Sequence, residues 1–239
     1  MSAPRCHRRF VPALVSLLAL AGFVGPAAAV PPQRLGGEYR YWRADGDSDL
    51  RDYVVWWSRR WFHLQYEYWD FVADDSHDHA RPEIGVHIPD RRNSVYTLQW
   101  RREYRRDRYT VSTDQVLADH WVGRFEVSPI VWPDSTQTVV SGGADYYWGS
   151  YNFASATIVH DPRENDLWIF PMRVRLANEE DDWIQLTLSP ASRHTLGWAV
   201  DLKVTGFKVG VERNSRYDFT NVDNVILTVG YEHSFPVRR

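Results

Sequence analysis

The last regular stretch of the chain, Asn224 to Phe235, alternates between two kinds of residue. Every second position is apolar or aromatic except His233, and the positions between them are mostly small or polar. A period of two residues is typical of a β-strand with one apolar face and one wet face. The stretch therefore predicts a β-strand at the end of the fold. One interpretation is that this strand forms the edge of a soluble sheet.

The position of Phe235 supports a second interpretation. An aromatic residue that ends a C-terminal strand resembles the insertion signal of bacterial outer-membrane β-barrels. In such a barrel the last strand must pair with the first, because an open sheet edge is not stable in lipid. The resemblance implies that Val229, Tyr231 and Phe235 form an assembly signal for the barrel-assembly machinery.

The first residues of the chain have the pattern of a secretory signal peptide. Arg5, Arg8 and Arg9 give a positive start, an apolar run covers residues 11–25, and three alanines occupy positions 27–29. The apolar run is too short for a membrane-spanning helix, and small residues of this kind are typical of a cleavage site. We therefore expect export from the cytoplasm.

Cleavage after Ala29 would separate a signal peptide, residues 1–29, from one exported domain, residues 30–239. The single cysteine, Cys6, lies in the signal, so we expect neither a disulfide nor thiolate chemistry in the domain. The signal holds three arginines and no acidic residue, which leaves 25 basic and 31 acidic residues and a net charge of −6. This balance argues against nucleic acid as a partner.

The exported domain consists of short alternating segments separated by turn residues. Their length suits barrel strands, fourteen is an admissible even number for a bacterial barrel, and short and long connections tend to alternate. The sequence therefore predicts an all-β fold, an antiparallel transmembrane up-and-down β-barrel of about 14 strands, with 12 strands as the alternative. The predicted strands are Leu35–Arg43, Tyr53–Ser58, Trp61–Val72, Glu83–Pro89, Ser94–Tyr104, Arg108–Leu117, Trp121–Trp132, Thr136–Tyr147, Tyr151–His160, Leu167–Leu176, Trp183–Ser189, Leu196–Val204, Phe207–Tyr217 and Val222–Phe235.

Three internal motifs and the ending resemble one family of such barrels. The motifs are YVVWWSRRW at Tyr53–Trp61, RYTV at Arg108–Val111, YYWGSY at Tyr146–Tyr151 and VGYEHSF at Val229–Phe235. With them the chain resembles the YaiO family of outer-membrane β-barrels over residues 38–235. The resemblance implies a barrel in the outer membrane and no known reaction. Many family members carry tetratricopeptide-like repeats before the barrel, whereas here we expect the barrel alone.

We expect no catalytic, cofactor-binding or metal-binding residue. The loop from Asp74 to His79 combines His and Asp at spacings that can bind a divalent metal, but a solvated outer loop is the plainer interpretation. Binding of a cation that bridges lipopolysaccharide molecules fits such a loop better than a dedicated metal site does. A lipid hydrolase would need Ser and His together, but Ser234 and His233 have opposite parity in their strand.

Strand parity predicts which side chains line the interior of the barrel. Acidic and basic residues balance in this set, which indicates an ion-paired wall rather than a strongly selective pore. The candidates that we expect to line the lumen are His63, Gln65, Glu67, Glu83, His87, Gln99, Arg101, Arg124, Glu126, Asp145, Arg173, Arg175, Asp201, Lys203, Lys208 and Glu212.

These features leave three functions open. We expect a non-enzymatic barrel of the bacterial outer membrane, in contact with lipid and lipopolysaccharide, that is a narrow, weakly selective channel or a structural surface barrel. A saccharide-like solute suits the amide and aromatic groups of the predicted lumen. The alternatives are an outer-membrane enzyme that modifies lipid or lipopolysaccharide and a soluble periplasmic β-barrel that binds a small apolar ligand.

Overall fold

The chain divides into two compact units, Met1–Pro31 and Pro32–Arg239, and the computed structural model describes residues of the second. The predicted signal peptide therefore lies outside the described residues. Among those residues, no helix is long and apolar enough to cross a membrane. The structure describes residues 33–44, 49–59, 61–72, 78–90, 94–149, 151–162, 167–178, 182–192, 196–213 and 224–235.

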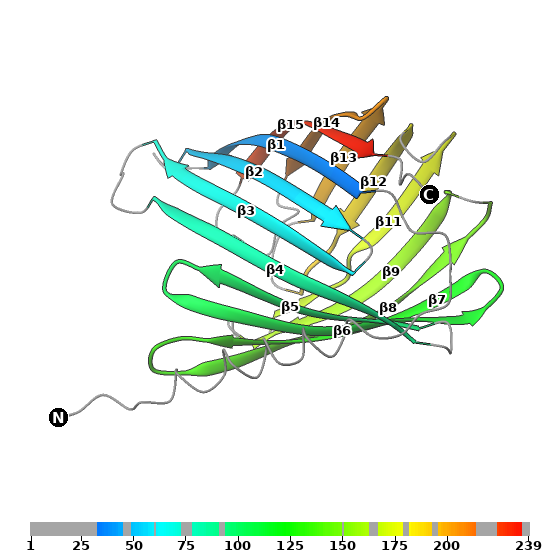
Figure 1. Cartoon of the computed structure of the whole chain (residues 1–239), viewed down its shortest axis with the longest axis horizontal. Helices are drawn as coiled ribbons and strands as arrows, with labels where there is room; N and C mark the ends of the chain where they lie inside the picture. Colours follow the sequence, from blue (N-terminus) through cyan, green and yellow to red (C-terminus); the bar gives the residue numbers. More distant parts are fainter. Residues whose placement is uncertain are drawn as a thin grey trace. The chain divides into compact units, whose positions relative to one another are not determined.

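All strands of the described residues belong to one antiparallel sheet (Figure 1). Alternating sequences of β-branched and aromatic residues form them, as expected for strands with two different faces. The strands are β1 (Gln33–Ala44), β2 (Leu50–Arg59), β3 (Phe62–Phe71), β4 (His79–Asp90), β5 (Ser94–Glu103), β6 (Arg106–Ala118), β7 (Trp121–Val131), β8 (Thr136–Tyr147), β9 (Phe153–Asp161), β10 (Leu167–Ile169), β11 (Met172–Ala177), β12 (Trp183–Ser189), β13 (Gly197–Val204), β14 (Phe207–Arg213) and β15 (Asn224–Phe235).

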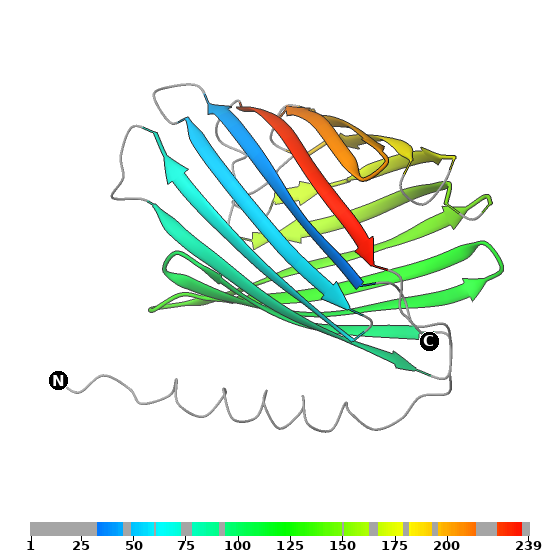
Figure 2. The same ribbon diagram turned by 45° about the horizontal axis from the view of Figure 1, so that its top comes forward.

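The sheet closes on itself. Successive strands are neighbours, β8 pairs with β9, and β15 pairs with β1 from Gln33 opposite Phe235 to Ala44 opposite Asn224. Figure 2 shows β1 in blue beside β15 in red. Both β10 and β11 pair with β9, so the fifteen described strands occupy fourteen positions around the barrel. The predicted closed barrel of 14 strands is confirmed.

The strand position shared by β10 and β11 is interrupted at Pro171. Proline has no N–H to donate to a ladder, so it is found at breaks and edges. Here the N–H of Phe170 donates to the carbonyl of Pro190 at 2.9 Å, and the carbonyl of Pro171 accepts from the N–H of Thr157 at 2.9 Å. The backbone therefore stays hydrogen-bonded through the break, and the single predicted segment from Leu167 to Leu176 is one interrupted strand.

Two strands begin clearly earlier than predicted: β2 begins at Leu50 rather than Tyr53, and β4 differs more. β4 begins at His79 rather than Glu83, so it includes Arg81 and Pro82, which we expected in a loop. The reason is the side chain of Arg81, which is buried between carboxylates of the neighbouring strands. From sequence alone, Arg followed by Pro is typical of a loop. In the structure, the ion pairs of Arg81 inside the barrel hold these two residues in a strand.

The outward face of the sheet is apolar along its middle. Leu227, Val229 and Val209 are exposed by 52%, 58% and 49% of their surface, although large apolar side chains are normally buried in soluble proteins. The strand registers place every residue that strand parity predicts to face lipid on this outward side. Those residues are Phe62, Leu64, Tyr66, Leu98, Trp100, Trp198, Val200, Leu202, Val209, Leu227 and Val229.

Aromatic residues flank this apolar band on the outward face. At the barrel end that carries Phe235, hereafter the Phe235 end, aromatic rings meet across neighbouring strands with centroids about 5 Å apart. Outward aromatics also occur nearer the opposite end, on β2, β3 and β5. An apolar band between two aromatic girdles is the pattern of transmembrane barrels. The cross-strand pairs at the Phe235 end are Trp57–Phe62, Trp121–Tyr146 and Phe207–Tyr231.

The buried apolar side chains form two clusters on the inward face, both toward the end opposite Phe235. The first cluster joins β1, β2, β3 and β15, and the second joins β7 to β10. Such clusters narrow the interior where they project into it. The first contains Trp42, Leu50, Trp69 and Ile226, and the second contains Ile130, Val139, Val159, Leu167 and Ile169.

Candidate functional site

The strand registers place all sixteen predicted lumen residues on the inward face of the sheet. Inward residues lie opposite one another in every pair of neighbouring strands, such as Gln65 opposite Glu83 and Gln185 opposite Asp201. Parity therefore suffices to predict the face, because the period of a strand is two residues. That these side chains line a conduction path stays a prediction. The inward charges form four groups, and each is spread over several neighbouring strands.

The first group is buried between β1 and β6. Arg81 lies 3.3 Å from a carboxylate oxygen of Glu67 and 3.3 Å from one of Glu103, and all three side chains are at most 4% exposed. On the adjacent strands, Arg40 donates to Glu38 at 2.8 Å and to Asp52 at 3.0 Å. Removing charges from water costs free energy unless each is paired and hydrogen-bonded. This part of the interior is therefore filled by an ion-pair network and leaves little room for solute.

The second group lies beside it on β3, β4 and β5. His63 Nε2 is 2.6 Å from a carboxylate oxygen of Glu83, and the other oxygen of Glu83 accepts from Arg101. His87 lies close by, with its ring centroid 6.1 Å from that of His63 and its Nδ1 3.1 Å from the hydroxyl of Thr97. These contacts bring together four residues that strand parity predicts in the lumen.

The third group spans β6, β7 and β8. Arg124 donates to Asp114 at 2.9 Å and to Asp145 at 2.8 Å. Further along the same strands, Arg108 lies 3.4 Å from Glu126. Each cation here has a carboxylate beside it, as the balanced composition predicts.

The fourth group closes the barrel across β13, β14, β15 and β1. Lys203 Nζ donates to Glu232 at 2.8 Å, and Arg34 lies 3.8 Å from the same carboxylate oxygen. Lys208 donates to Glu38 at 3.0 Å. Strand closure produces the contacts of Arg34 with Glu232 and of Lys208 with Glu38, and the latter two residues are 170 residues apart in the chain.

Arg173 and Arg175 on β11 differ from the other inward cations. Among the described residues neither has a carboxylate within ion-pair distance. Arg173 donates through Nε to the hydroxyl of Ser155 at 3.2 Å. Arg175 donates through Nε and Nη2 to the amide oxygen of Gln185 at 3.1 and 2.8 Å. Among the described residues, the charge of neither guanidinium group is therefore cancelled by a direct ion pair.

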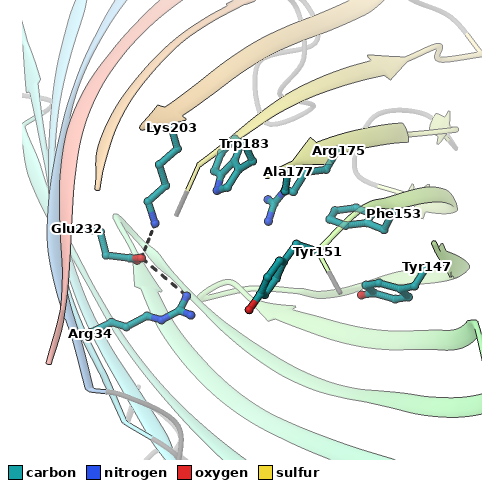
Figure 3. A pocket seen from close by; sticks show the side chains of 9 residues that line it. All are labelled: Arg34, Tyr147, Tyr151, Phe153, Arg175, Ala177, Trp183, Lys203 and Glu232. Carbon is teal, nitrogen blue, oxygen red and sulfur yellow. Dashed lines mark hydrogen bonds and ion pairs between the residues drawn. The ribbon is translucent and has the colours of Figure 1, made fainter. Parts of the chain in front are cut away.

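A hollow of about 410 Å³ opens beside Arg175 at the Phe235 end of the barrel (Figure 3). Three cations and one carboxylate contribute to its lining, together with four aromatic rings. Figure 3 shows these side chains converging from β1, β8, β9, β11, β12, β13 and β15 on one space. The hollow, called the Arg175 pocket below, is lined by Arg34, Tyr147, Tyr151, Phe153, Arg175, Ala177, Trp183, Lys203 and Glu232.

Two aromatic rings fix the guanidinium of Arg175 within this pocket. Its central carbon lies 4.2 Å from the ring centroid of Trp183 and 5.0 Å from that of Phe153. A guanidinium against aromatic faces gains cation–π attraction and loses rotamer freedom. The pocket therefore presents an arginine that is held in place before any ligand arrives.

Sequence reasoning predicted Arg175 and Lys203 but missed most of the pocket. Arg34 and Glu232 have the inward parity of β1 and β15, so the same alternation could have identified them. Tyr151 precedes β9 in a turn, where alternation gives no signal. The pocket as a whole depends on closure, because β1 and β15 must meet before Arg34 and Glu232 can share a site.

The arrangement of the described side chains does not support metal binding or hydrolysis. In the part of the chain that the structure describes, no group of three His, Cys, Asp or Glu residues could hold a metal ion. Most of the Asp74–His79 loop lies outside that part. His233 faces outward, with its ring centroid 4.5 Å from that of Phe235.

Comparison with known proteins identifies the fold. No protein-family model matches the sequence, and no curated protein matches it significantly. The outer membrane protein Omp33 of Acinetobacter baumannii is similar over 87% of this chain and 100% of its own, with 10% identity and a TM-score of 0.55. The KdgM porin, solved in complex with disordered oligogalacturonate, is similar over 84% of this chain and 99% of its own, with 10% identity and a TM-score of 0.50. A Rhodopseudomonas blastica porin is similar over 84% of this chain and 99% of its own, with 8% identity and a TM-score of 0.50. The chain therefore has the fold of outer-membrane porin barrels.

Proposed function

We propose that this chain is a porin-like barrel of the bacterial outer membrane and forms a narrow channel for small polar solutes. The observation that carries the proposal is the contrast between the two faces of the closed sheet. Apolar side chains such as Leu227 and Val229 are exposed outside, while charged side chains are turned inside. A water-soluble barrel has the opposite distribution, so a soluble ligand-binding barrel fits poorly.

The interior favours a narrow path rather than a wide pore. Fourteen strands enclose less space than the sixteen to eighteen of general porins. The network around Arg81 and the two apolar clusters fill much of that space. The Arg175 pocket provides open room at the Phe235 end, so solute would enter the barrel there, beside β11, β12 and β13. Because most inward charges are paired, we expect weak selectivity between simple salt ions.

A saccharide-like solute suits this path. Aromatic rings and amide groups offer stacking and hydrogen bonds, and the Arg175 pocket combines both. A barrel of the same fold binds oligogalacturonate, although at 10% identity the likeness extends to the fold alone. Membership of the YaiO family, by contrast, rests on the sequence motifs and remains part of this proposal.

Export and assembly complete the proposal. We expect the chain to cross the inner membrane with residues 1–29 as a cleaved signal, and to reach the outer membrane through recognition of Val229, Tyr231 and Phe235. Once inserted, the apolar band would contact lipid and lipopolysaccharide. Mass spectrometry of the mature protein would check cleavage after Ala29, and carbonate-washed membrane fractions would check its location.

Planar-bilayer recording of the purified barrel tests the channel directly. We expect small, steady steps of conductance with a reversal potential near zero in a salt gradient of KCl. Absence of conductance, with correctly folded protein in the bilayer, would show a closed structural barrel instead. Large conductance with strong selectivity for either ion would contradict the paired interior.

A further inference from the structure

We infer that the Arg175 pocket binds the carboxylate of an acidic sugar, with Arg175 as the main anion contact. The inference deepens the proposed function, since it names the solute class that the path selects. It rests on a difference between two cations of β11 and the other inward cations. Arg175 and its neighbour Arg173 have no carboxylate within ion-pair distance among the described residues, whereas the other inward cations described above do.

The hydrogen-bonding state of Arg175 leaves room for a carboxylate. Its Nε and Nη2 atoms donate to one oxygen of Gln185, and Nη1 has no hydrogen-bond acceptor among the described residues. Gln185 is neutral, so it orients the guanidinium without cancelling its charge. Arginine recognises carboxylates through parallel N–H groups, and such charge-assisted bonds are stronger than neutral ones. The free edge of Arg175 therefore offers a ready carboxylate site.

The single acidic residue in the described lining, Glu232, does not oppose such a ligand. Its carboxylate oxygen Oε1 accepts from Lys203 and lies close to Arg34, so two cations neutralise it. The lining then carries three positive charges against one negative charge. In a partly desolvated hollow this excess attracts anions more strongly than in open water.

Arg173 extends the positive strip along β11. Side chains two residues apart on a strand project from the same face and are about 7 Å apart. Arg173 is bonded to the neutral hydroxyl of Ser155, so it also keeps its charge. An oligomer with a carboxylate on successive rings could therefore contact Arg175 and then Arg173.

The aromatic rings favour a sugar over a plain inorganic anion. Phe153, Trp183, Tyr147 and Tyr151 line the same hollow, and the two tyrosine hydroxyls can donate or accept hydrogen bonds. Flat aromatic faces suit the C–H faces of pyranose rings, and hydroxyls suit their edges. A fatty acid would instead need a continuous apolar groove, whereas this lining mixes charges with rings.

Binding is best measured on the purified, detergent-solubilised barrel by isothermal titration. The probes are trigalacturonate, its methyl ester, in which the charge is removed, and neutral maltotriose. We expect trigalacturonate to bind about tenfold or more tightly than either neutral probe, since a charge-assisted contact is lost in both. Equal binding of all three, or none by trigalacturonate, would overturn the inference.

Matched variants assign the binding to the pocket. Arg175→Gln should weaken trigalacturonate binding about tenfold or more, and Arg175→Lys should weaken it less, because charge remains but the fork is lost. The control is Arg108→Gln, which removes one inward charge of the ion-paired wall at β6. An equal loss in the control would show a general effect of lumen charge and refute the assignment. Heat-modifiable gel migration of each variant verifies that it is folded.

The titration is independent of conduction, so the two proposals can fail separately. A barrel that conducts KCl but does not prefer trigalacturonate would retain the channel function and contradict the inference. A barrel that binds trigalacturonate through Arg175 but never conducts would retain the binding site and contradict the channel.

Discussion

The guanidinium of Arg81 on β4 lies 3.3 Å from the carboxylate of Glu67 on β3, and both side chains are almost completely buried inside the barrel. Trp69 strengthens the arrangement, because its Nε1 donates to Glu67 at 2.6 Å and its ring lies 4.1 Å from the Arg81 guanidinium carbon. A buried pair of this kind is sensitive to loss of either partner, since the remaining charge keeps only part of its compensation, here Arg40 at 4.0 Å from Glu67.

We therefore predict that Arg81→Met destabilises the barrel by about 3–5 kcal/mol, because Glu67 and Glu103 would lose their shared cation in a buried site. The control is Arg51→Met at the exposed pair of Arg51 and Asp70, which are 3.4 Å apart. That change should cost less than about 1 kcal/mol. Urea unfolding in lipid vesicles, followed by tryptophan fluorescence, gives both values. Equal stability of the two variants would show that water reaches the Arg81 network freely.

Adjacent residues in the middle of β5 test which face of the sheet meets lipid. Leu98 faces outward, and Gln99 faces inward opposite Gly85 and Thr110. Leu98→Arg should cost about 2–4 kcal/mol, because arginine is unfavourable against the centre of a bilayer. Gln99→Arg should be tolerated better, since polar groups surround it. Quantifying folded protein in outer-membrane fractions compares them, and equal yields would contradict the assignment of faces.

Much of this fold follows from alternation alone. The run from Asn224 to Phe235 predicts both a strand and its two faces, and the same rule predicts the inward side of Arg173 and Arg175. It fails at Arg81, because the sequence around it is typical of a loop and its carboxylate partners lie on other strands. Alternation also cannot separate a paired cation from an unpaired one. Lys208 and Arg175 are both predicted to face inward. Lys208 lies 3.5 Å from Asp201 on the adjacent strand, and closure of the barrel adds Glu38, whereas none of the described carboxylates lies within ion-pair distance of Arg175.

The turn between β13 and β14 should require glycine at position 206. Thr205 and Gly206 have φ angles of 49° and 86°, as in the tight turns that match the twist of a hairpin. A Cβ at Gly206 would lie 2.4 Å from the carbonyl oxygen of Glu232. The backbone N–H of Glu232 in turn donates to the carbonyl of Gly206 at 2.9 Å. Gly206→Ala should therefore destabilise the barrel by about 1–3 kcal/mol. It should also disturb the Arg175 pocket through Glu232.

The control for this change is Gly142→Ala. A Cβ at Gly142 would meet its nearest atoms at 3.9 Å, and the residue lies in the regular part of β8. Urea unfolding of the two variants should separate them clearly. Similar midpoints would mean that the turn adjusts to a side chain and does not hold Glu232 in place.

Truncation at the C-terminus tests where the closing strand and its assembly signal end. β15 ends at Phe235, which lies opposite Gln33, the first residue of β1. Residues 236–239 lie outside the described part of the chain, and Pro236 has no N–H to extend the ladder. Deleting these four residues should therefore leave outer-membrane levels close to those of the full chain. Deleting Phe235 as well should lower them several-fold, because the last rung of the pairing that closes the barrel is lost. Immunoblots of outer-membrane fractions from the two truncations, with a periplasmic protein as the loading control, give the comparison. A sharp loss with the shorter deletion alone would place part of the signal beyond Phe235.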